Sequence, residues 1–127
     1  MPGKKIDFDT VRGIALGLSG VEESTAYGSP AFKVGGKLLA CIAINKSAEP
    51  GTLAVCVDFE RRAELMAAAP DVYYVTDHYE GHPTVLVRMS RIHGDALRDL
   101  IGMAWHYVTA QTRASKGGAG KRKKGAR

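Results

Sequence analysis

Residues 113–127 carry seven cationic side chains and no acidic one. Because positive charges on a flexible segment neutralise nucleic-acid phosphates and release their counterions, this pattern predicts nucleic-acid binding without sequence preference. A segment that aids solubility, or that adheres to anionic membranes or ribosomes, is the alternative. No helix-turn-helix or basic helix is evident, so base-specific readout is not expected. The predicted nucleic-acid ligands are Arg113, Lys116, Lys121, Arg122, Lys123, Lys124 and Arg127.

The charge of the preceding residues contrasts with this segment. The 127-residue chain has a formal charge of +5, yet residues 1–112 hold 11 of the 18 Lys and Arg against all 13 Asp and Glu, a charge of −2. The Gly, Ala, Ser, Lys and Arg of the last segment cannot bury enough apolar surface to offset the entropy of ordering. We therefore expect a domain over residues 1–112 and a disordered basic C-terminal tail over residues 113–127.

A second set of polar side chains falls on segments that could converge beside a sheet. Lys33, Asp58 and Arg88 each occupy the strand face opposite an apolar neighbour, so they share one side of the sheet if those faces coincide. Acidic and basic groups gathered there would bind a small anionic ligand. Alternatively, Asp58 forms a structural salt bridge with Arg88 or Lys33 on a solvated face. The candidate ligand pocket comprises Tyr27, Lys33, Asp58, His78, Tyr79 and Arg88.

The other reactive side chains form no catalytic or metal-binding pattern. His78 and His82 are four residues apart, but the Gly and Pro near them disfavour the helix that would align two metal ligands. Cys41 and Cys56 lie in strand-like apolar runs without metal-ligand spacing, so both are expected to be reduced core thiols. No Ser or Cys has the flanking residues of an activated nucleophile. The sequence therefore predicts a non-catalytic protein with no cofactor and no metal.

Hydrophobic periodicity predicts an α+β domain. Apolar residues at spacings of three and four indicate helices, and alternating ones indicate strands. The short connections favour an antiparallel sheet of about five strands backed by helices, in the order α-β-β-β-α-β-β-α. The expected helices cover residues 8–18, 60–69 and 95–111, and the expected strands cover 32–34, 37–44, 53–59, 72–75 and 84–89.

A Gly-Gly pair at positions 35 and 36 predicts a tight β-hairpin, because the favoured two-residue turns need positive φ. Counting outward from the turn pairs Val34 with Lys37 and Phe32 with Leu39. One face of the hairpin then carries Phe32, Val34, Leu39 and Cys41, and the other carries Lys33, Leu38, Ala40, Ile42 and Ile44. The apolar part of the second face gives an alternative function, a protein-interaction or chaperone-like module that pairs with a partner protein or forms a homodimer.

Three segments have a specific order and spacing. They are GVEESTAYGSPAFKVGGKLLA at 20–40, VDFERRAELMAAAPDVYYVTDHYEGHPTVLVRM at 57–89, and the last helix with Trp105. Together they resemble the MmcQ/YjbR family of small bacterial proteins, over roughly residues 8–108. The resemblance implies a curved antiparallel sheet backed by helices, as in frataxin and type III secretion chaperones. The family is commonly labelled DNA-binding, so the resemblance also implies DNA as the nucleic acid.

The longest apolar run, residues 38–44, is far shorter than a membrane span, and the first residues have no apolar signal-peptide core. We therefore expect a cytoplasmic protein with no membrane association.

Overall fold

Six strands and four helices make up the part of the chain that the computed structural model describes. It describes the backbone of residues 6–26 and 28–117, and the side chains of these ranges as far as Gln111. In chain order the elements are α1 (Phe8–Leu16), β1 (Val21–Ala26), β2 (Ser29–Val34), β3 (Lys37–Ile42), β4 (Thr52–Cys56), α2 (Phe59–Ala68), β5 (Tyr73–Tyr74), α3 (Asp77–Glu80), β6 (Thr84–Arg88) and α4 (Gly94–Gly117).

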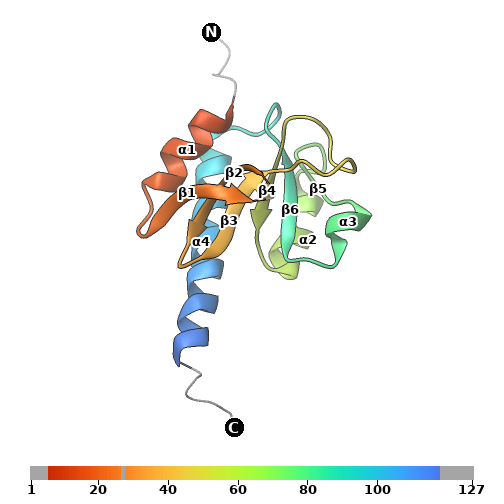
Figure 1. The fold of residues 1–127 in the computed structure, drawn as a ribbon. Coiled ribbons are helices and arrows are strands. Elements are labelled where there is room, and N and C mark those ends of the chain that lie inside the picture. Colours follow the sequence, from red (N-terminus) through yellow and green to blue (C-terminus); the bar gives the residue numbers. More distant parts are fainter. Residues whose placement is uncertain (1–5, 27, 118–127) are drawn as a thin grey trace.

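The strands form one antiparallel sheet in the order β1-β2-β3-β4-β6-β5. Residues of α1, α2 and α4 pack together against one face, and Figure 1 shows α4 running behind the sheet. The short helix α3 contacts β6, and its Tyr79 packs on the opposite face. The predicted α+β class and antiparallel sheet are confirmed, with six strands in place of about five.

The main core lies between the sheet and these three helices. Alternation along β4 sends Leu53 and Val55 into this core, and both are fully buried. Phe32 stacks on Phe8 of α1 with ring centroids 5.1 Å apart. The predicted apolar stripe of α4 faces the same core, through the buried side chains Leu97, Leu100, Ile101, Ala104 and Val108.

The hairpin turn is confirmed, but its predicted register holds only next to the turn. Gly35 and Gly36 have φ of 59° and 80°, and Val34 pairs with Lys37 as expected. A β-bulge between Phe32 and Lys33 then shifts the register, so Phe32 pairs with Ala40 and not with Leu39.

The bulge changes which side chains share a face. Leu39 and Ala40 are both fully buried in the main core, whereas Cys41 belongs to a smaller apolar cluster with Ala31. The predicted apolar face of Leu38, Ala40, Ile42 and Ile44 is therefore wrong as a set, because Ala40 lies under the helices. Formation of a homodimer, or binding of a protein partner, at the sheet face away from the helices stays a prediction.

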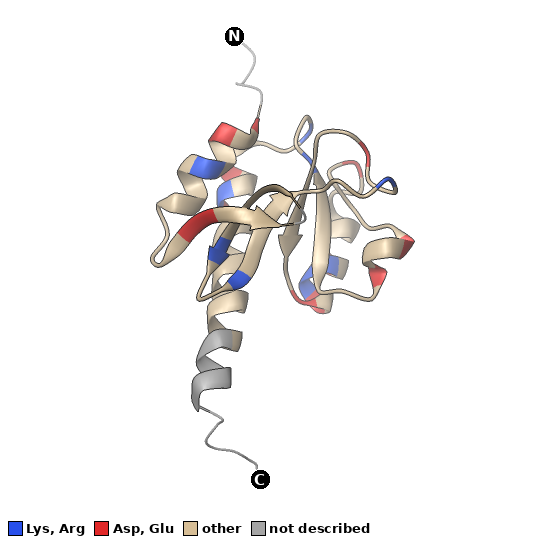
Figure 2. Ribbon diagram, viewed as in Figure 1, with Lys and Arg blue, Asp and Glu red and all other residues tan. Residues whose placement is uncertain are grey.

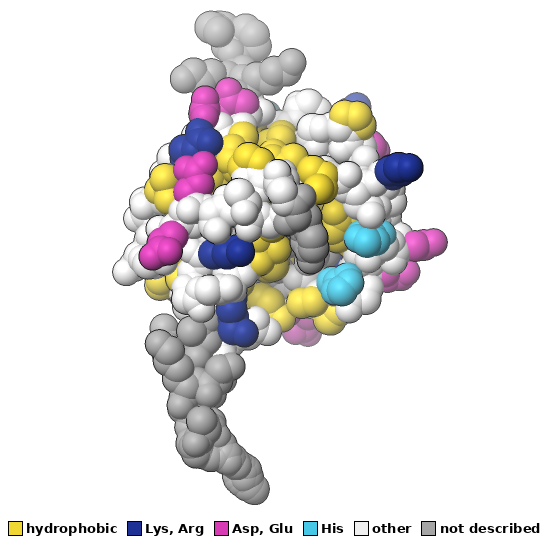
Figure 3. All heavy atoms as spheres, in the orientation of Figure 1, with side chains coloured by type: hydrophobic (Ala, Val, Ile, Leu, Met, Phe, Trp, Pro, Cys, Tyr) yellow, Lys and Arg dark blue, Asp and Glu magenta, His cyan; other side chains and the backbone are white. Residues whose placement is uncertain are grey.

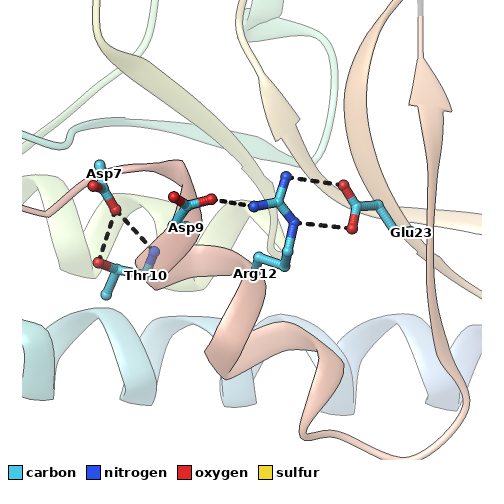
Figure 4. A network of polar contacts seen from close by, with 5 residues as sticks. All are labelled: Asp7, Asp9, Thr10, Arg12 and Glu23. Carbon is cyan, nitrogen blue, oxygen red and sulfur yellow. Dashed lines mark hydrogen bonds and ion pairs between the residues drawn. The ribbon is translucent and has the colours of Figure 1, made fainter.

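Strand β1 replaces a loop expected between the first helix and the hairpin. It pairs with β2 along its whole length, and its middle residues are exposed. Figure 4 shows how it is tied to α1: Arg12 donates to both carboxylate oxygens of Glu23, at 2.9 and 3.1 Å, and also contacts Asp9. Asp7 caps α1 by accepting a 3.0 Å hydrogen bond from the Thr10 amide.

Helix α4 is longer than predicted. Its helical backbone runs through residues 113 and 116 and ends at Gly117, past the expected end at Gln111. Arg113 and Lys116, which were predicted to be disordered, thus belong to the helix. The other tail residues proposed to bind nucleic acid, Lys121, Arg122, Lys123, Lys124 and Arg127, lie outside the described residues. No helix in the described part of the chain is long and apolar enough to cross a membrane.

The positive φ of Gly36 gives a test of the hairpin. Replacing Gly36 with Ala should lower the free energy of unfolding by about 1–2 kcal/mol, because a Cβ is strained in this conformation. Urea denaturation measures the change. The control is Gly13→Ala on the exposed side of α1, where a Cβ meets nothing within 4 Å and should stabilise the helix by about 0.5–1 kcal/mol. Equal effects of the two substitutions would contradict the turn geometry.

Candidate ligand pocket on the open face of the sheet

The face of the sheet away from α1, α2 and α4 carries small apolar side chains on its central strands. Ala31, Cys41, Ala54 and Leu86 form a separate buried cluster there. Partly buried side chains complete its edges, among them Leu38 and Tyr79. Figure 3 views the molecule in the orientation of Figure 1 and shows apolar side chains over the sheet, with His side chains at one side. This face therefore presents apolar surface without a covering helix layer.

A pocket of about 810 Å³ lies on this face. Its floor consists of strand residues from β3 and β4, and its two sides are the segment after β3 and the segment around α3. The lining residues are Leu38, Cys41, Ile42, Ile44, Asn45, Lys46, Ala54, Cys56, His78, Tyr79, His82, Pro83 and Thr84. The volume falls within the range of small-molecule sites in proteins.

Arg62 of α2 fixes the side of the pocket that contains the histidines. Its Nη1 lies 3.0 Å from the carbonyl oxygen of His82, 3.2 Å from that of Thr84 and 3.4 Å from that of Tyr79. Its Nη2 donates to the carbonyl of Glu80 at 3.1 Å. A guanidinium group has several N–H donors and can therefore bind several neighbouring carbonyls of one segment at the same time. Arg62 thus joins α2 to residues 79–84 and positions that side.

The opposite side of the pocket is tied to the same region by side-chain hydroxyls. Ser47 Oγ lies 2.7 Å from Thr76 Oγ1, just before α3. The Tyr74 hydroxyl accepts from the Glu49 amide at 2.9 Å and lies 2.7 Å from the hydroxyl of buried Thr52. Both sides of the pocket are therefore held in place by hydrogen bonds.

The floor of the pocket is electrically neutral at physiological pH. The pKa of Cys56 is raised from 9.0 to about 11, chiefly by burial and to a smaller extent by the nearby Cys41 thiol, while a hydrogen bond with Thr84 lowers it. Burial also raises the pKa of Cys41. Both cysteines are free thiols, as predicted. An apolar floor of protonated thiols suits an uncharged part of a ligand.

The structure brings together only some of the residues predicted to form a ligand pocket. His78 and Tyr79 line the pocket, with ring centroids 4.8 Å apart. Lys33 is paired with Leu38 across the hairpin but does not line the pocket. Tyr27 lies outside the described residues.

Arg88 and Asp58 do not join this group, so their predicted convergence is wrong. Arg88 lies opposite Thr52, at the other end of the β4–β6 pair, and forms a two-bond ion pair with Glu49 at 2.8 and 3.0 Å. This contact lowers the pKa of Glu49. The Arg88 guanidinium also stacks over the Tyr74 ring, 4.2 Å from its centroid. The proposed salt bridge of Arg88 with Asp58 is thus replaced by one with Glu49.

Asp58 is the N-cap of α2, where its carboxylate accepts a 2.6 Å hydrogen bond from the Arg61 amide. It lines a different hollow of about 680 Å³ between α2 and α4, beside Arg61, Arg98 and Asp99. The carboxylates and guanidinium groups of this hollow offer no single sign of charge to a ligand.

The described residues contain no cluster of three or more His, Cys, Asp or Glu side chains that could hold a metal ion. Of the residues that line the pocket, the sequence-based prediction included only His78 and Tyr79; it missed Lys46, Cys56 and His82 among others, and also Arg62, which holds one side of the pocket. Cys56 could have been found from strand parity, since it lies two residues from Ala54 on β4. Arg62 and Lys46 give no signal of their own in a single sequence.

Comparisons with known proteins agree with this architecture. A family model described as YjbR matches residues 16–107. The uncharacterised proteins Rv2570 of Mycobacterium tuberculosis and Mb2600 of Mycobacterium bovis are each 46% identical to the chain over 41 residues, about a third of this chain and of theirs. The crystal structure of Deinococcus radiodurans protein DR2400, with domain DUF419, superposes with a TM-score of 0.69 at 23% identity, covering 86% of this chain and 83% of that one. This last match shows a shared fold.

The role of Arg62 can be tested against its neighbour. Arg62→Met should lower the free energy of unfolding by about 1–3 kcal/mol and speed amide exchange in residues 79–84, because several carbonyls lose a charged donor. Arg61→Met is the control, since Arg61 is exposed and pairs only at the surface with Glu64. Thermal denaturation and hydrogen exchange measure both. Unchanged exchange in Arg62→Met would show that the loop does not depend on this contact.

The raised pKa of Cys56 predicts its reactivity. In a Cys41→Ala variant, which keeps the burial of Cys56 but loses the smaller effect of Cys41, alkylation of Cys56 by iodoacetamide at pH 8 should be at least about tenfold slower than for an equally accessible thiol of ordinary pKa, because the thiolate is the nucleophile. The rate should keep rising through pH 10, and a plateau near pH 9 would contradict the shift. By linkage, the stability contributed by protonated Cys56 is present below pH 9 and lost as the pH rises towards about 11.

Proposed function

This chain belongs to the YjbR family, and we propose that it is a non-catalytic domain that binds nucleic acid without sequence preference through its basic C-terminal residues. The observation that carries the proposal is the separation of charge along the chain. Residues 113–127 hold seven cations and no acid, against a formal charge of −2 for residues 1–112. Such a segment binds phosphates by releasing counterions and needs no shaped site.

The geometry of α4 supports this function. The helix has 24 residues, which corresponds to about 36 Å. Among its described side chains the last buried one is Val108, and residues 109–111 after it are partly or largely exposed. Figure 1 shows the helix continuing beyond the sheet towards the C-terminus. The described end of the helix, at Gly117, therefore lies beyond the sheet, and five of the seven proposed cationic ligands follow it in the sequence.

The positions of the charged residues in the body of the domain are intermingled. Figure 2 shows blue and red segments scattered over a mostly tan ribbon, and neither colour forms a continuous stripe in this view. Several Arg side chains are already paired with carboxylates, as in Arg12 with Glu23 and Arg88 with Glu49. Neutralised cations contribute little to phosphate binding. DNA as the preferred nucleic acid, and a likeness to the frataxin fold, are implied by the family resemblance and belong to this proposal.

A salt titration tests the proposal. The logarithm of the binding constant of the full chain for duplex DNA should fall with the logarithm of salt concentration at a slope of about −5 to −6, as expected for five to seven phosphate contacts. In the full-length variant with five tail cations changed to Gln, the slope should become shallower by about 4 to 5. The substituted residues are Lys121, Arg122, Lys123, Lys124 and Arg127.

The matched control removes the same charge from the body of the domain. It changes five cations that lie outside the tail to Gln, and its slope should equal that of the unmodified chain. These residues are Lys33, Lys37, Arg61, Arg91 and Arg98. A slope near zero for the full chain, or a loss of binding in the control but not in the tail variant, would overturn the proposal.

A further inference from the structure

The pocket on the open face has the shape of a ligand site because of the size of its floor residues. Ala54 and the thiols of Cys41 and Cys56 in the middle of the floor are small, whereas Leu38 and Ile42 near the ends of β3 and Tyr79 of α3 are large. A patch of short side chains ringed by long ones leaves a hollow that the protein's own atoms do not fill. Protein side chains normally pack at a density that fills such a space, so the volume of about 810 Å³ is available to a ligand.

The charge of the rim is one-sided. Among the described residues that line the pocket, Lys46, His78 and His82 are the basic ones, and none is a carboxylate. The acidic residues of α3, Asp77 and Glu80, are exposed and do not line it. The rim also contains the amide of Asn45 and the hydroxyl of Thr84. Hydrogen-bond donors and positive charge on the rim complement an anionic group.

Floor and rim thus recognise different parts of one molecule. The floor contains protonated thiols and alkyl side chains, so a charged group cannot be placed there without loss of solvation. Ile44 at the mouth is 56% exposed, and a bound apolar group would remove part of that surface from water.

The pocket is also preformed. Arg62 holds the segment with the histidines through four backbone carbonyls, and Ser47 joins the other side to Thr76. A ligand therefore does not have to order these segments when it binds, which preserves affinity for a small molecule.

From the charge and shape of this site we propose that the pocket binds a small amphipathic carboxylate, with its apolar body on the floor of β3 and β4 and its carboxylate at the rim of Lys46, His78 and His82. The class includes medium-chain aliphatic acids and aromatic acids. None of the residues that line the pocket belongs to the C-terminal basic segment, and the proposal does not depend on nucleic-acid binding.

The test uses octanoate, 1-octanol and octylamine, which share one apolar body and differ in charge. Titrations of the full chain followed by amide NMR should show saturable binding of octanoate, with shifts concentrated in residues 38–46, 54–56 and 78–84. Octylamine should bind at least about tenfold more weakly than octanoate, and octanol should lie between them. No saturable binding of octanoate up to about 10 mM, equal binding of octanoate and octylamine, or shifts centred elsewhere would overturn the proposal.

Charge reversal at the rim supplies the second measurement. Lys46→Glu should weaken octanoate binding by about tenfold, because it places a carboxylate where the ligand's anion lies. Lys37→Glu is the control, since it makes the same change of charge at an exposed position on β3 that does not line the pocket. Equal effects of the two variants would overturn the assignment of the rim.

Two further outcomes separate this proposal from its alternatives. The full-length variant with the five tail cations changed to Gln should bind octanoate as the unmodified chain does, so failure of either proposal leaves the other standing.

If sedimentation shows a dimer that Ile44→Asp dissociates, and octanoate does not bind the dimer, the pocket is an interface between copies of the chain and the proposal is wrong.

Discussion

Alternation along the central strands divides the sheet into two surfaces, and only one of them is covered by a layer of helices. Leu53 and Val55 of β4 face the helices, whereas Ala54 belongs to the cluster on the other face and, like Cys56 at the end of the strand, lines the pocket. The three packed helices bury the large side chains, which gives the domain its core. The other surface keeps small side chains on its floor, and the pocket exists because no helix fills that space. On β4, the larger side chains Leu53 and Val55 thus add to the core, and small Ala54 on the opposite face leaves room for the pocket.

The contact between Arg62 and the segment after α3 connects these two surfaces. Arg62 belongs to α2, which packs on the helix-covered face of the sheet. Its guanidinium binds backbone carbonyls at the rim of the pocket, on the opposite face. Because the acceptors are carbonyls, the contact depends on the backbone path of residues 79–84 and not on their side chains. Other side chains could therefore replace the histidines at the rim while Arg62 still holds this side of the pocket. In this loop the backbone carbonyls fix the structure, and the side chains would contact a ligand.

The sequence allowed the elements to be predicted better than their register and their contacts. The Gly-Gly turn and the apolar stripe of α4 were identified because each has a local pattern. The bulge near Phe32 has no such pattern, and it moved Ala40 into the core. Strand β1 was missed because its middle residues face water on both sides. The prediction placed Asp58 and Arg88 on one face because side chains alternate along a strand. This alternation says nothing about distance along the strands. Arg88 pairs with Thr52 at the first residue of β4, whereas Asp58 lies two residues past the other end of that strand, so about 13 Å of strand already separates the two positions.

The pocket and α4 lie on opposite faces of the same strands, which raises the question of whether binding at one site affects the other. Helix α4 contacts β3 and β4, and these strands also form the floor of the pocket. Coupling between two sites requires an element with two arrangements that both ligands bias. Here the shared element is the centre of a hydrogen-bonded sheet whose core side chains, such as Val55, are fully buried. Close packing leaves these strands one arrangement, so the basic segment at the end of α4 and the pocket are expected to act independently.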